Sequence, residues 1–362
     1  MKGLVNKNSV ASKERSSNFE LMRLFLILFV IILHFNDTSR QGALTFVSNA
    51  PLSNMCFLFM MESLTICAVD AFVLLSGYFM TRKTCSNIRK VVNLFLTLVL
   101  YSFFLQLSSG IYNHDYSAQR MLTSLNPSNY YAWLYSTVFL LAPFLNIIME
   151  KLDKKLDLFI VVILIFFSVI PTIIDYMGVV LNIEVGGMST ISNNGNGRGF
   201  TLVNFVLCYY VGGYLARKDV TGNGNAFLIY IVSSLLIFFG MFFNRSHALD
   251  YCNIFVIIQA AAFLLMFRNL NIKKHELINV LAKSVWGVFI LHGCLMSVYS
   301  KHVNFENLVT GDLLPLILHF LVCIIAILVF SLFLDKVFSF ALKPIHYIMD
   351  KIGFINKTIS IE

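Results

Sequence analysis

One apolar stretch decides the fold class: Asn18-Phe-Glu-Leu-Met-Arg-Leu-Phe-Leu-Ile-Leu-Phe-Val-Ile-Ile-Leu-His-Phe35. The hydrocarbon core of a bilayer needs roughly 20 apolar residues as a helix, so the stretch is long enough to span a membrane. It contains Arg23 and His34, about three helical turns apart, which places both on one face and roughly 16 Å apart along the axis. An ionisable side chain at membrane depth usually faces a bundle interior, a cavity or a partner. We therefore predict that this helix forms one wall of a polar cleft that connects the two sides of the membrane.

The composition of the chain also indicates a membrane protein. Of the 362 residues, 58% are hydrophobic and only 13% are charged, against roughly 45–50% and 25% in ordinary soluble domains. The seven cysteines are scattered and form no CxxC motif, so we interpret them as small apolar residues. We therefore predict an all-α, polytopic integral membrane protein.

The apolar ranges predict about ten transmembrane helices. We place them at residues 18–36, 52–79, 91–109, 129–149, 158–178, 200–216, 226–243, 249–267, 281–300 and 313–334. These helices divide the chain into a cytoplasmic tail, a transmembrane domain and a basic cytoplasmic tail, at residues 1–17, 18–335 and 336–362.

The positive charges predict the orientation. If the N-terminus is cytoplasmic, the segments on that side hold 21 of the 27 lysines and arginines. Such an excess of positive charge on the cytoplasmic side predicts an N-in, C-in protein of the cytoplasmic membrane. It also explains the net charge of +8 through contact with anionic membrane lipids, so we expect no nucleic-acid partner.

Arg23 and His34 of the first helix differ in chemistry and in depth. In the predicted orientation, Arg23 lies toward the cytoplasm, where a permanently charged guanidinium suits a phosphate or a carboxylate. His34 lies toward the outer side, where an imidazole can take a proton from a hydroxyl or carry an acyl group. Glu20, three residues before Arg23, can pair with it on the same helix face. The pattern suits a donor that enters from inside and an acceptor that waits outside.

The Arg-x10-His pattern of this helix, which opens Phe19-Glu-Leu-Met-Arg23, resembles the membrane-bound acyltransferase family 3. The stretch Val69-Asp-Ala-Phe-Val-Leu-Leu-Ser-Gly-Tyr78 is similar to the Phe-Phe-hydrophobic-Leu-Ser-Gly signature of that family, with Ala71-Phe72 in place of Phe-Phe. Later segments that resemble the family are Ala132–Tyr135 with Pro143, Tyr209–Ala216 and Gly287–His292. The resemblance covers roughly residues 18–335. It implies ten helices, an N-in orientation and O-acylation of cell-surface sugars.

The resemblance also implies roles for individual residues. His34 matches the catalytic residue of the family, and Arg23 is implied to handle the donor or to take part in catalysis. The Arg-x-x-Arg element of the family, implied to hold coenzyme A, departs here to Arg89-Lys90-Val-Val-Asn93, with Asn93 at the second basic position. We therefore assign contact with coenzyme A to four basic residues together: Arg82, Lys83, Arg89 and Lys90.

Three further residues are candidates for the site. Asp70, deep in the second apolar range, is predicted to be catalytic by orienting His34 or holding Arg23. Glu62, nearer the outer side, is predicted to contact the sugar. Arg198, also predicted to bind substrate, lies in a Gly/Asn-rich stretch that we interpret as a surface loop or as a lid over the cleft. No His, Cys or carboxylate set has ligand spacing within one helix, so we expect no metal.

We predict transfer of an acyl group, expected to be acetyl, from cytoplasmic acetyl-coenzyme A to a hydroxyl of an envelope saccharide or lipid-linked sugar outside. His34 would act as general base or as a transient acyl carrier. Two other classes stay open: a polymerase or flippase for lipid-linked oligosaccharides, and a secondary transporter with Arg23, His34, Asp70 and Glu62 along its path. Polymerases and flippases usually have more crossings and larger outer loops. Transporters often show inverted repeats, and none is visible in this sequence.

Overall fold

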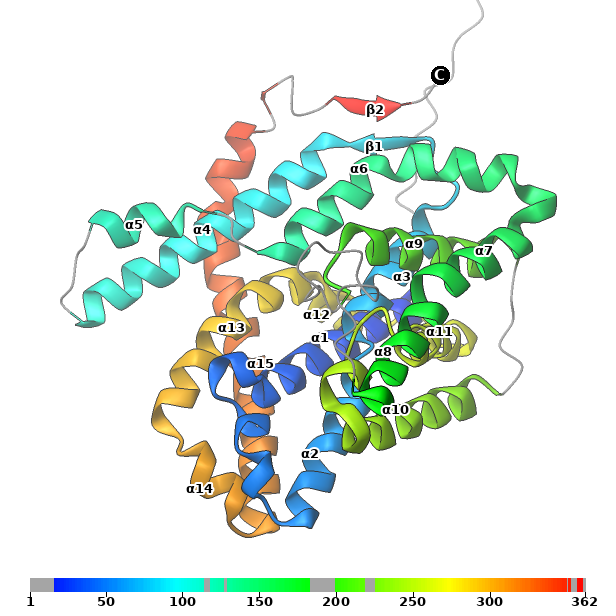
Figure 1. The fold of residues 1–362 in the computed structure, drawn as a ribbon. Helices are drawn as coiled ribbons and strands as arrows, with labels where there is room; N and C mark the ends of the chain where they lie inside the picture. Colours follow the sequence, from blue (N-terminus) through cyan, green and yellow to red (C-terminus); the bar gives the residue numbers. More distant parts are fainter. Residues whose placement is uncertain are drawn as a thin grey trace, which may run out of the picture.

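The computed structural model describes residues 16–113, 118–126, 129–182, 199–218, 225–349, 351–352 and 357–360. Long helices make up nearly all of this part of the chain (Figure 1). In the first half they are α1 (Ser17–Asn36), α2 (Leu52–Thr65), α3 (Ala68–Met80), α4 (Ile88–Asn113), α5 (Ala118–Ser124), α6 (Tyr130–Lys151), α7 (Leu156–Leu164) and α8 (Ile170–Leu181). In the second half they are α9 (Leu202–Arg217), α10 (Ala226–Ala248), α11 (Ile254–Asn269), α12 (Glu276–Leu281), α13 (Val285–His302), α14 (Phe305–Thr310) and α15 (Leu313–Met349).

Short elements join these helices. Three 3-10 turns, η1 (Thr38–Arg40), η2 (Ala43–Thr45) and η3 (Val47–Asn49), connect α1 to α2. A π-helical turn, η5 (Ile165–Val169), joins α7 to α8, and a 3-10 turn, η6 (Ala282–Ser284), precedes α13. Three further elements, a 3-10 turn and two strands, complete the order: η4 (Asp153–Lys155), β1 (Cys85–Asn87) and β2 (Thr358–Ser360).

The predicted class, a polytopic helical membrane protein, is confirmed. Within the described residues, eight helical spans are long and apolar enough to cross a membrane: Ser17–Asn36, Leu52–Met80, Ile88–Ile111, Tyr130–Lys151, Leu156–Leu181, Ala226–Ala248, Glu276–His302 and Leu313–Ile345. The other two predicted ranges fall on α9 and α11, which have 16 residues each. The number of helices that cross and the N-in orientation stay predictions.

Three features of the fold refine the predicted ranges or add to them. The range 52–79 is two helices, α2 and α3, with a break at Ile66 and Cys67. Helix α15 continues 15 residues beyond its predicted end, because Leu342 is buried against Tyr101 and Leu291 and gives the extension its own small core. Strands β1 and β2 pair antiparallel, with Cys85 opposite Ser360, and so tie the basic loop after α3 to the C-terminal segment (Figure 1).

Helix α1 lies in the middle of the bundle, where it contacts α2, α3, α11, α12, α13 and α15. Its apolar side chains enter two separate cores. Met22 and Leu26 belong to the core around α3, α9 and α11, and Ile27, Ile31 and Phe35 belong to the core around α2, α13 and α15. A helix that is apolar on nearly all sides is buried in this way. The central position of α1 is what places Arg23 and His34 among the packed helices.

Helices α3 and α9 cross at very close range through two glycines. A Cβ atom on Gly212 would overlap the carbonyl oxygen of Leu74, and a Cβ atom on Gly77 would overlap the carbonyl oxygen of Tyr209. Small residues at a crossing let two membrane helices approach in this manner. The crossing sets the position of α3, which supplies one wall of the cavity described below.

We expect Gly212→Ala to lower the free energy of unfolding by about 1–3 kcal/mol, because the added methyl group meets backbone that cannot move aside. Thermal unfolding of the purified protein in detergent measures the effect. Gly240→Ala is the matched control, since its Cβ atom would meet side chains and no backbone: the hydroxyl end of Tyr176 at 2.7 Å and the Cβ atom of Ala248 at 3.3 Å. Equal melting temperatures for Gly212→Ala and the wild type would contradict the close crossing.

Candidate active site

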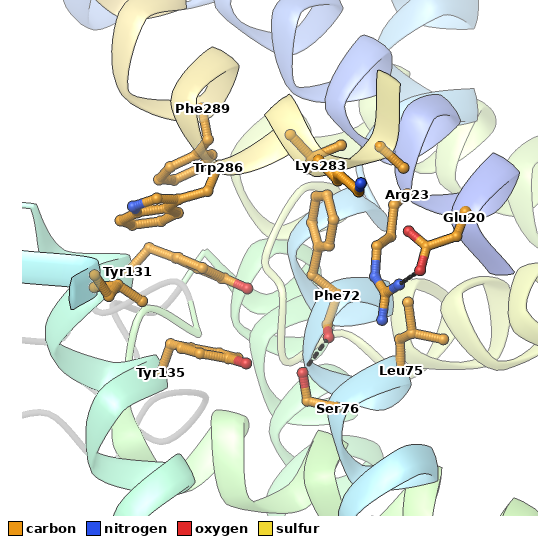
Figure 2. Close-up of a pocket in the computed structure, with 13 residues that line it drawn as sticks. Glu20, Arg23, Phe72, Leu75, Ser76, Tyr131, Tyr135, Lys283, Trp286 and Phe289 are labelled. Carbon is orange, nitrogen blue, oxygen red and sulfur yellow. Dashed lines mark hydrogen bonds and ion pairs between the residues drawn. The ribbon is translucent and has the colours of Figure 1, made fainter. Parts of the chain in front are cut away.

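The Arg23 side chain reaches a cavity of about 480 Å³ between α1, α3, α4, α6 and the start of α13 (Figure 2). Aromatic rings line one side: Tyr131 stacks on Tyr135 with ring centroids 5.7 Å apart, and Trp286 stacks on Phe289 at 5.4 Å. Figure 2 shows both tyrosine hydroxyl groups pointing into the cavity. The polar residues that line it are Glu20, Arg23, Ser76, Tyr131, Tyr135 and Lys283. The cavity therefore combines flat apolar walls with two cations.

Glu20 holds the Arg23 guanidinium in place. Arg23 donates a hydrogen bond from Nη1 to Glu20 Oε1 at 2.6 Å, which confirms the expected pairing of the two residues. The Glu20 side chain is buried, whereas the Arg23 side chain is 32% exposed, so the outer part of the guanidinium faces the cavity. Its central carbon also lies 5.8 Å from the centre of the Phe79 ring. Arg23 is thus a fixed cation at the cavity wall.

A neighbouring cavity of about 290 Å³ shares Arg23 and Tyr135 with the first and adds Lys83 and Lys90. Two of the four predicted coenzyme A contacts are therefore brought to the same space as Arg23. The hydroxyl oxygen of Ser136, which also lines this cavity, is buried and has no hydrogen-bond partner among the described residues. Buried hydroxyl groups in proteins usually have a hydrogen-bond partner. The hydroxyl of Ser136 is therefore available to donate a hydrogen bond to a bound ligand or to accept one from it.

The other two predicted coenzyme A contacts lie elsewhere. Arg82 lines a third cavity, of about 230 Å³, together with Lys83 and Arg217. Arg89 donates its backbone N–H to Asn87 Oδ1 at 2.8 Å at the start of α4, and its side chain lines none of these three cavities. The four predicted coenzyme A contacts therefore do not all lie beside Arg23: Lys83 and Lys90 do, and Arg82 and Arg89 do not.

Lys283 was missed as a site residue in the sequence. It stands in η6, directly before α13, and lines the Arg23 cavity together with Trp286. In the sequence it is one of several cytoplasmic positive charges, and only its position three residues before a tryptophan sets it apart.

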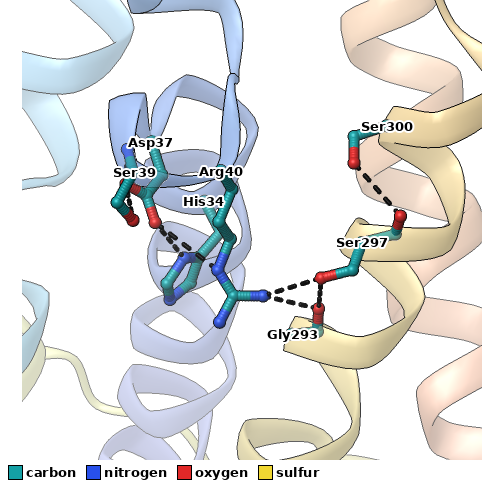
Figure 3. A network of polar contacts seen from close by, with 7 residues as sticks. All are labelled: His34, Asp37, Ser39, Arg40, Gly293, Ser297 and Ser300. Carbon is teal, nitrogen blue, oxygen red and sulfur yellow. Dashed lines mark hydrogen bonds and ion pairs between the residues drawn. The ribbon is translucent and has the colours of Figure 1, made fainter.

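His34, at the other end of α1, is held by Asp37 (Figure 3). The Nδ1 atom of His34 lies 3.3 Å from Asp37 Oδ2. An ionised carboxylate can only accept, so Nδ1 carries the proton and Nε2 of the neutral ring keeps its lone pair. This is the arrangement by which a carboxylate orients a general-base histidine. Asp37, and not the predicted Asp70, therefore fills the orienting position.

A short network fixes Asp37 itself. Asp37 Oδ1 accepts from the backbone N–H of Ser39 at 2.8 Å and from its hydroxyl at 2.7 Å. Arg40 Nε lies 3.6 Å from Asp37 Oδ2, while Arg40 Nη1 donates to the carbonyl oxygen of Gly293 at 2.6 Å and to Ser297 Oγ at 3.1 Å (Figure 3). The loop after α1 is thereby tied to α13.

The same network keeps Asp37 charged. Burial by itself would raise the pKa of Asp37, but hydrogen bonds from His34 and Ser39 outweigh it and lower the pKa from 3.8 to about 2. A carboxylate with a lowered pKa stabilises the folded state above its ordinary pKa, and this contribution is lost as the pH falls through about 2. Asp37 is therefore ionised, and able to hold His34, throughout the neutral and mildly acidic range.

His292 is a second histidine at this end, with its ring centroid 4.8 Å from that of His34. It is 4% exposed, and its Nδ1 lies 3.0 Å from the carbonyl oxygen of Val288, so Nδ1 donates. Its Nε2 is buried and has no hydrogen-bond partner among the described residues. Only one of the two ring nitrogens of His292 is therefore satisfied within the described residues.

One aromatic ring borders both ends of the site. Phe289 lines the Arg23 cavity, and its ring centroid lies 5.7 Å from that of His292. His34 and His292 are not among the residues that line this cavity. The Arg23 cavity therefore does not by itself form the continuous cleft that the sequence predicted, and Phe289 is a residue that borders both the cavity and the histidine pair.

The remaining predicted site residues lie apart from the Arg23 cavity. Asp70 is 1% exposed and accepts from Asn204 Nδ2 of α9 at 3.0 Å, so it faces α9 and not α1. Glu62 is also buried, and accepts from Asn36 Nδ2 at 2.8 Å, two residues beyond His34. Arg198 lies outside the described residues.

Comparison with known proteins identifies the family of the chain. The family model described as an acyltransferase domain, of acyltransferase family 3, matches residues 16–336. Searches among curated proteins and among solved structures found no match. The family match covers most of the chain and includes both ends of α1, the cavity and α13. The chain therefore belongs to acyltransferase family 3 and is a membrane protein that transfers acyl groups.

Proposed function

We propose that the protein is an O-acyltransferase that moves an acyl group, acetyl in the simplest case, from cytoplasmic acyl-coenzyme A to a hydroxyl of a cell-surface saccharide on the outer side. The observation that carries the proposal is the chemical difference between the ends of α1. One end has a cation-lined cavity around Arg23, and the other has a histidine oriented by a carboxylate.

The donor end suits a molecule with both phosphates and a long arm. Arg23, Lys83, Lys90 and Lys283 line the two adjoining cavities. Coenzyme A carries its phosphates at one end and its thioester at the other. The cations would hold the phosphates, with Arg23 as the planar, bidentate donor. The aromatic walls would hold the arm that leads toward Phe289.

The acceptor end suits removal of a proton from a hydroxyl. In the direct route, His34 Nε2 takes the hydroxyl proton as the oxygen attacks the thioester carbonyl; a C–O bond forms, the C–S bond breaks, and the proton passes to the thiolate. In a two-step route, Nε2 attacks the thioester carbonyl, a C–N bond forms and the C–S bond breaks with release of the thiolate; the hydroxyl oxygen then attacks the acyl carbon, the C–N bond breaks, and the hydroxyl proton passes to the thiolate. Asp37 orients the ring and stabilises its positive charge in both routes.

The acyl group would have to pass Phe289, because its ring borders both the Arg23 cavity and His292. We expect Phe289→Trp, which adds a second ring in that space, to lower turnover at least about tenfold, since the acyl group can no longer reach His34. The dissociation constant for coenzyme A should change less than about twofold. Phe289→Leu is the control and should retain most of the activity. Full turnover in Phe289→Trp would contradict a route past this residue.

Labelled acetyl-coenzyme A added to inverted membrane vesicles tests the proposed reaction. Such vesicles expose the cytoplasmic face, so we expect label to appear on saccharide inside the vesicle and to disappear in His34→Ala membranes. Saccharide chains that lengthen without label would contradict the proposal and support a polymerase. Labelled saccharide in equal amount with and without His34 would contradict the assigned residue.

A further inference from the structure

His292 has an unused ring nitrogen close to the histidine on which the proposed function depends. Its Nδ1 atom lies 3.0 Å from the carbonyl oxygen of Val288, one turn earlier in α13. A carbonyl oxygen can only accept, so Nδ1 carries the proton and the lone pair of the neutral ring is on Nε2. This Nε2 atom is buried and has no hydrogen-bond partner within the part of the chain that the structure describes. His292 therefore holds a free nitrogen lone pair in the interior of the protein.

An unpaired acceptor of this kind needs an explanation, because the large majority of buried polar atoms in proteins are hydrogen-bonded, and a role in catalysis is one such explanation. A neutral imidazole attacks a carbonyl carbon through the lone pair of its unprotonated nitrogen. A hydrogen bond donated to Nε2 would occupy that lone pair. The hydrogen bond from Nδ1 to Val288 and the lack of a donor at Nε2 thus leave His292 in the form that a nucleophile requires.

His292 also lies in contact with both ends of the site. Its ring centroid is 4.8 Å from that of His34, and 5.7 Å from that of Phe289, which lines the Arg23 cavity. An acyl group that leaves the cavity past Phe289 therefore comes within reach of His292. From there it lies next to the imidazole that faces the acceptor.

The two imidazoles differ in their exposure to water. The side chain of His34 is 30% exposed, whereas His292 is 4% exposed. Water hydrolyses an acyl-imidazole, so an acyl carrier needs a place from which water is excluded. A general base must instead reach the hydroxyl of an acceptor that arrives from outside. Burial suits His292 to the first task, and exposure suits His34 to the second.

We propose that His292, and not His34, carries the acyl group between donor and acceptor, an assignment that rests on the proposed acyltransferase function. In the first step Nε2 of His292 attacks the thioester carbonyl carbon; a C–N bond forms, the C–S bond breaks, and the thiolate of coenzyme A leaves. The proton on Nδ1 stays in its hydrogen bond to Val288. The acylated ring is therefore a cation, which makes it a reactive acyl donor.

In the second step the acceptor hydroxyl oxygen attacks the acyl carbon while His34 Nε2 takes the hydroxyl proton. A C–O bond forms and the C–N bond breaks, which returns His292 to the neutral ring. Asp37, 3.3 Å from His34 Nδ1, stabilises the positive charge that His34 acquires. The proton then passes from His34 to the thiolate, so the products are the ester and the thiol of coenzyme A.

Exchange of label between acetyl-coenzyme A and radiolabelled coenzyme A, without saccharide, tests for this carrier in the purified full-length protein. Label enters acetyl-coenzyme A only if the enzyme holds the acyl group while one thiol replaces the other. We expect exchange in the wild type. His292→Gln has no nucleophilic nitrogen and should lower both exchange and transfer to saccharide at least about 100-fold. Its dissociation constant for coenzyme A should change less than about twofold, which shows that the variant is folded.

His34→Ala separates the two imidazoles. It should lose transfer to saccharide but keep exchange within about threefold of the wild type, because the first step uses only His292. His319→Ala, which removes an exposed imidazole on α15, is the matched control and should keep both activities.

The outcomes distinguish this proposal from the proposed function. Wild-type protein that acylates saccharide but exchanges no label overturns the carrier and leaves the direct route, a result that needs no variant to fold. Loss of exchange in His34→Ala, or its retention in His292→Gln, overturns the assignment as well. A wild type without exchange and without transfer would contradict the proposed function, and the carrier with it.

Discussion

His34→Ala abolishes acyl transfer: we expect turnover to fall about 10²- to 10⁴-fold, the contribution of a positioned general base. The loss follows from the position of the ring, whose Nδ1 proton is committed to Asp37 and whose Nε2 is the free nitrogen. Transfer of label from acetyl-coenzyme A to saccharide measures it, and the amount of folded protein in the membrane is compared at the same time.

His319→Ala is the matched control for this prediction. His319 is exposed on α15 and interacts with the Tyr299 hydroxyl at 3.3 Å, and it lies outside the polar network of His34. It should retain activity. Asp37→Asn gives a second check, because an amide in place of the carboxylate can hold the wrong tautomer of His34 and should lower turnover without changing the affinity for coenzyme A. Near-normal turnover in His34→Ala would remove the residue from the reaction.

Arg23→Lys weakens the binding of coenzyme A, and we expect the dissociation constant to rise about tenfold. A lysine keeps the charge but loses the planar fork that meets Glu20 on one side and can meet a phosphate on the other. Isothermal calorimetry with coenzyme A measures the change.

Arg245→Lys is the matched control, because Arg245 donates to the carbonyl oxygen of Leu44 in η2, beyond the His34 end of α1. It should leave the affinity for coenzyme A unchanged. An unchanged dissociation constant in Arg23→Lys would give Arg23 a purely structural role as the partner of Glu20.

The apolar stretch of α1 was sufficient to predict the fold class and the position of two key residues. Its 20 residues are about the number that a helix needs to cross a bilayer. Helical geometry alone was enough to place Arg23 and His34 on one face. All ten predicted ranges fall on helices for the same reason, since hydropathy reports length and burial directly.

The partners of these residues could not be predicted, because they depend on how helices pack. Asp70 was expected near His34, but the glycine crossing of α3 with α9 turns it toward Asn204. Asp37 was overlooked, although it stands only three residues after His34, because the turn that brings it back to the imidazole begins where the helix ends.

Site residues from distant parts of the chain could not be predicted from the sequence either. Phe289 and Lys283 reach the site only through the packing of α13 against α1.

The most direct test of the account compares the binding of coenzyme A to His34→Gln and to Arg23→Lys, by calorimetry in the same detergent. The proposed donor site lies at one end of α1 and the proton acceptor at the other. We therefore expect His34→Gln to bind coenzyme A as tightly as the wild type while transferring no acyl group, and Arg23→Lys to bind about tenfold more weakly. Loss of coenzyme A binding in His34→Gln, or unaltered binding in Arg23→Lys, would contradict it.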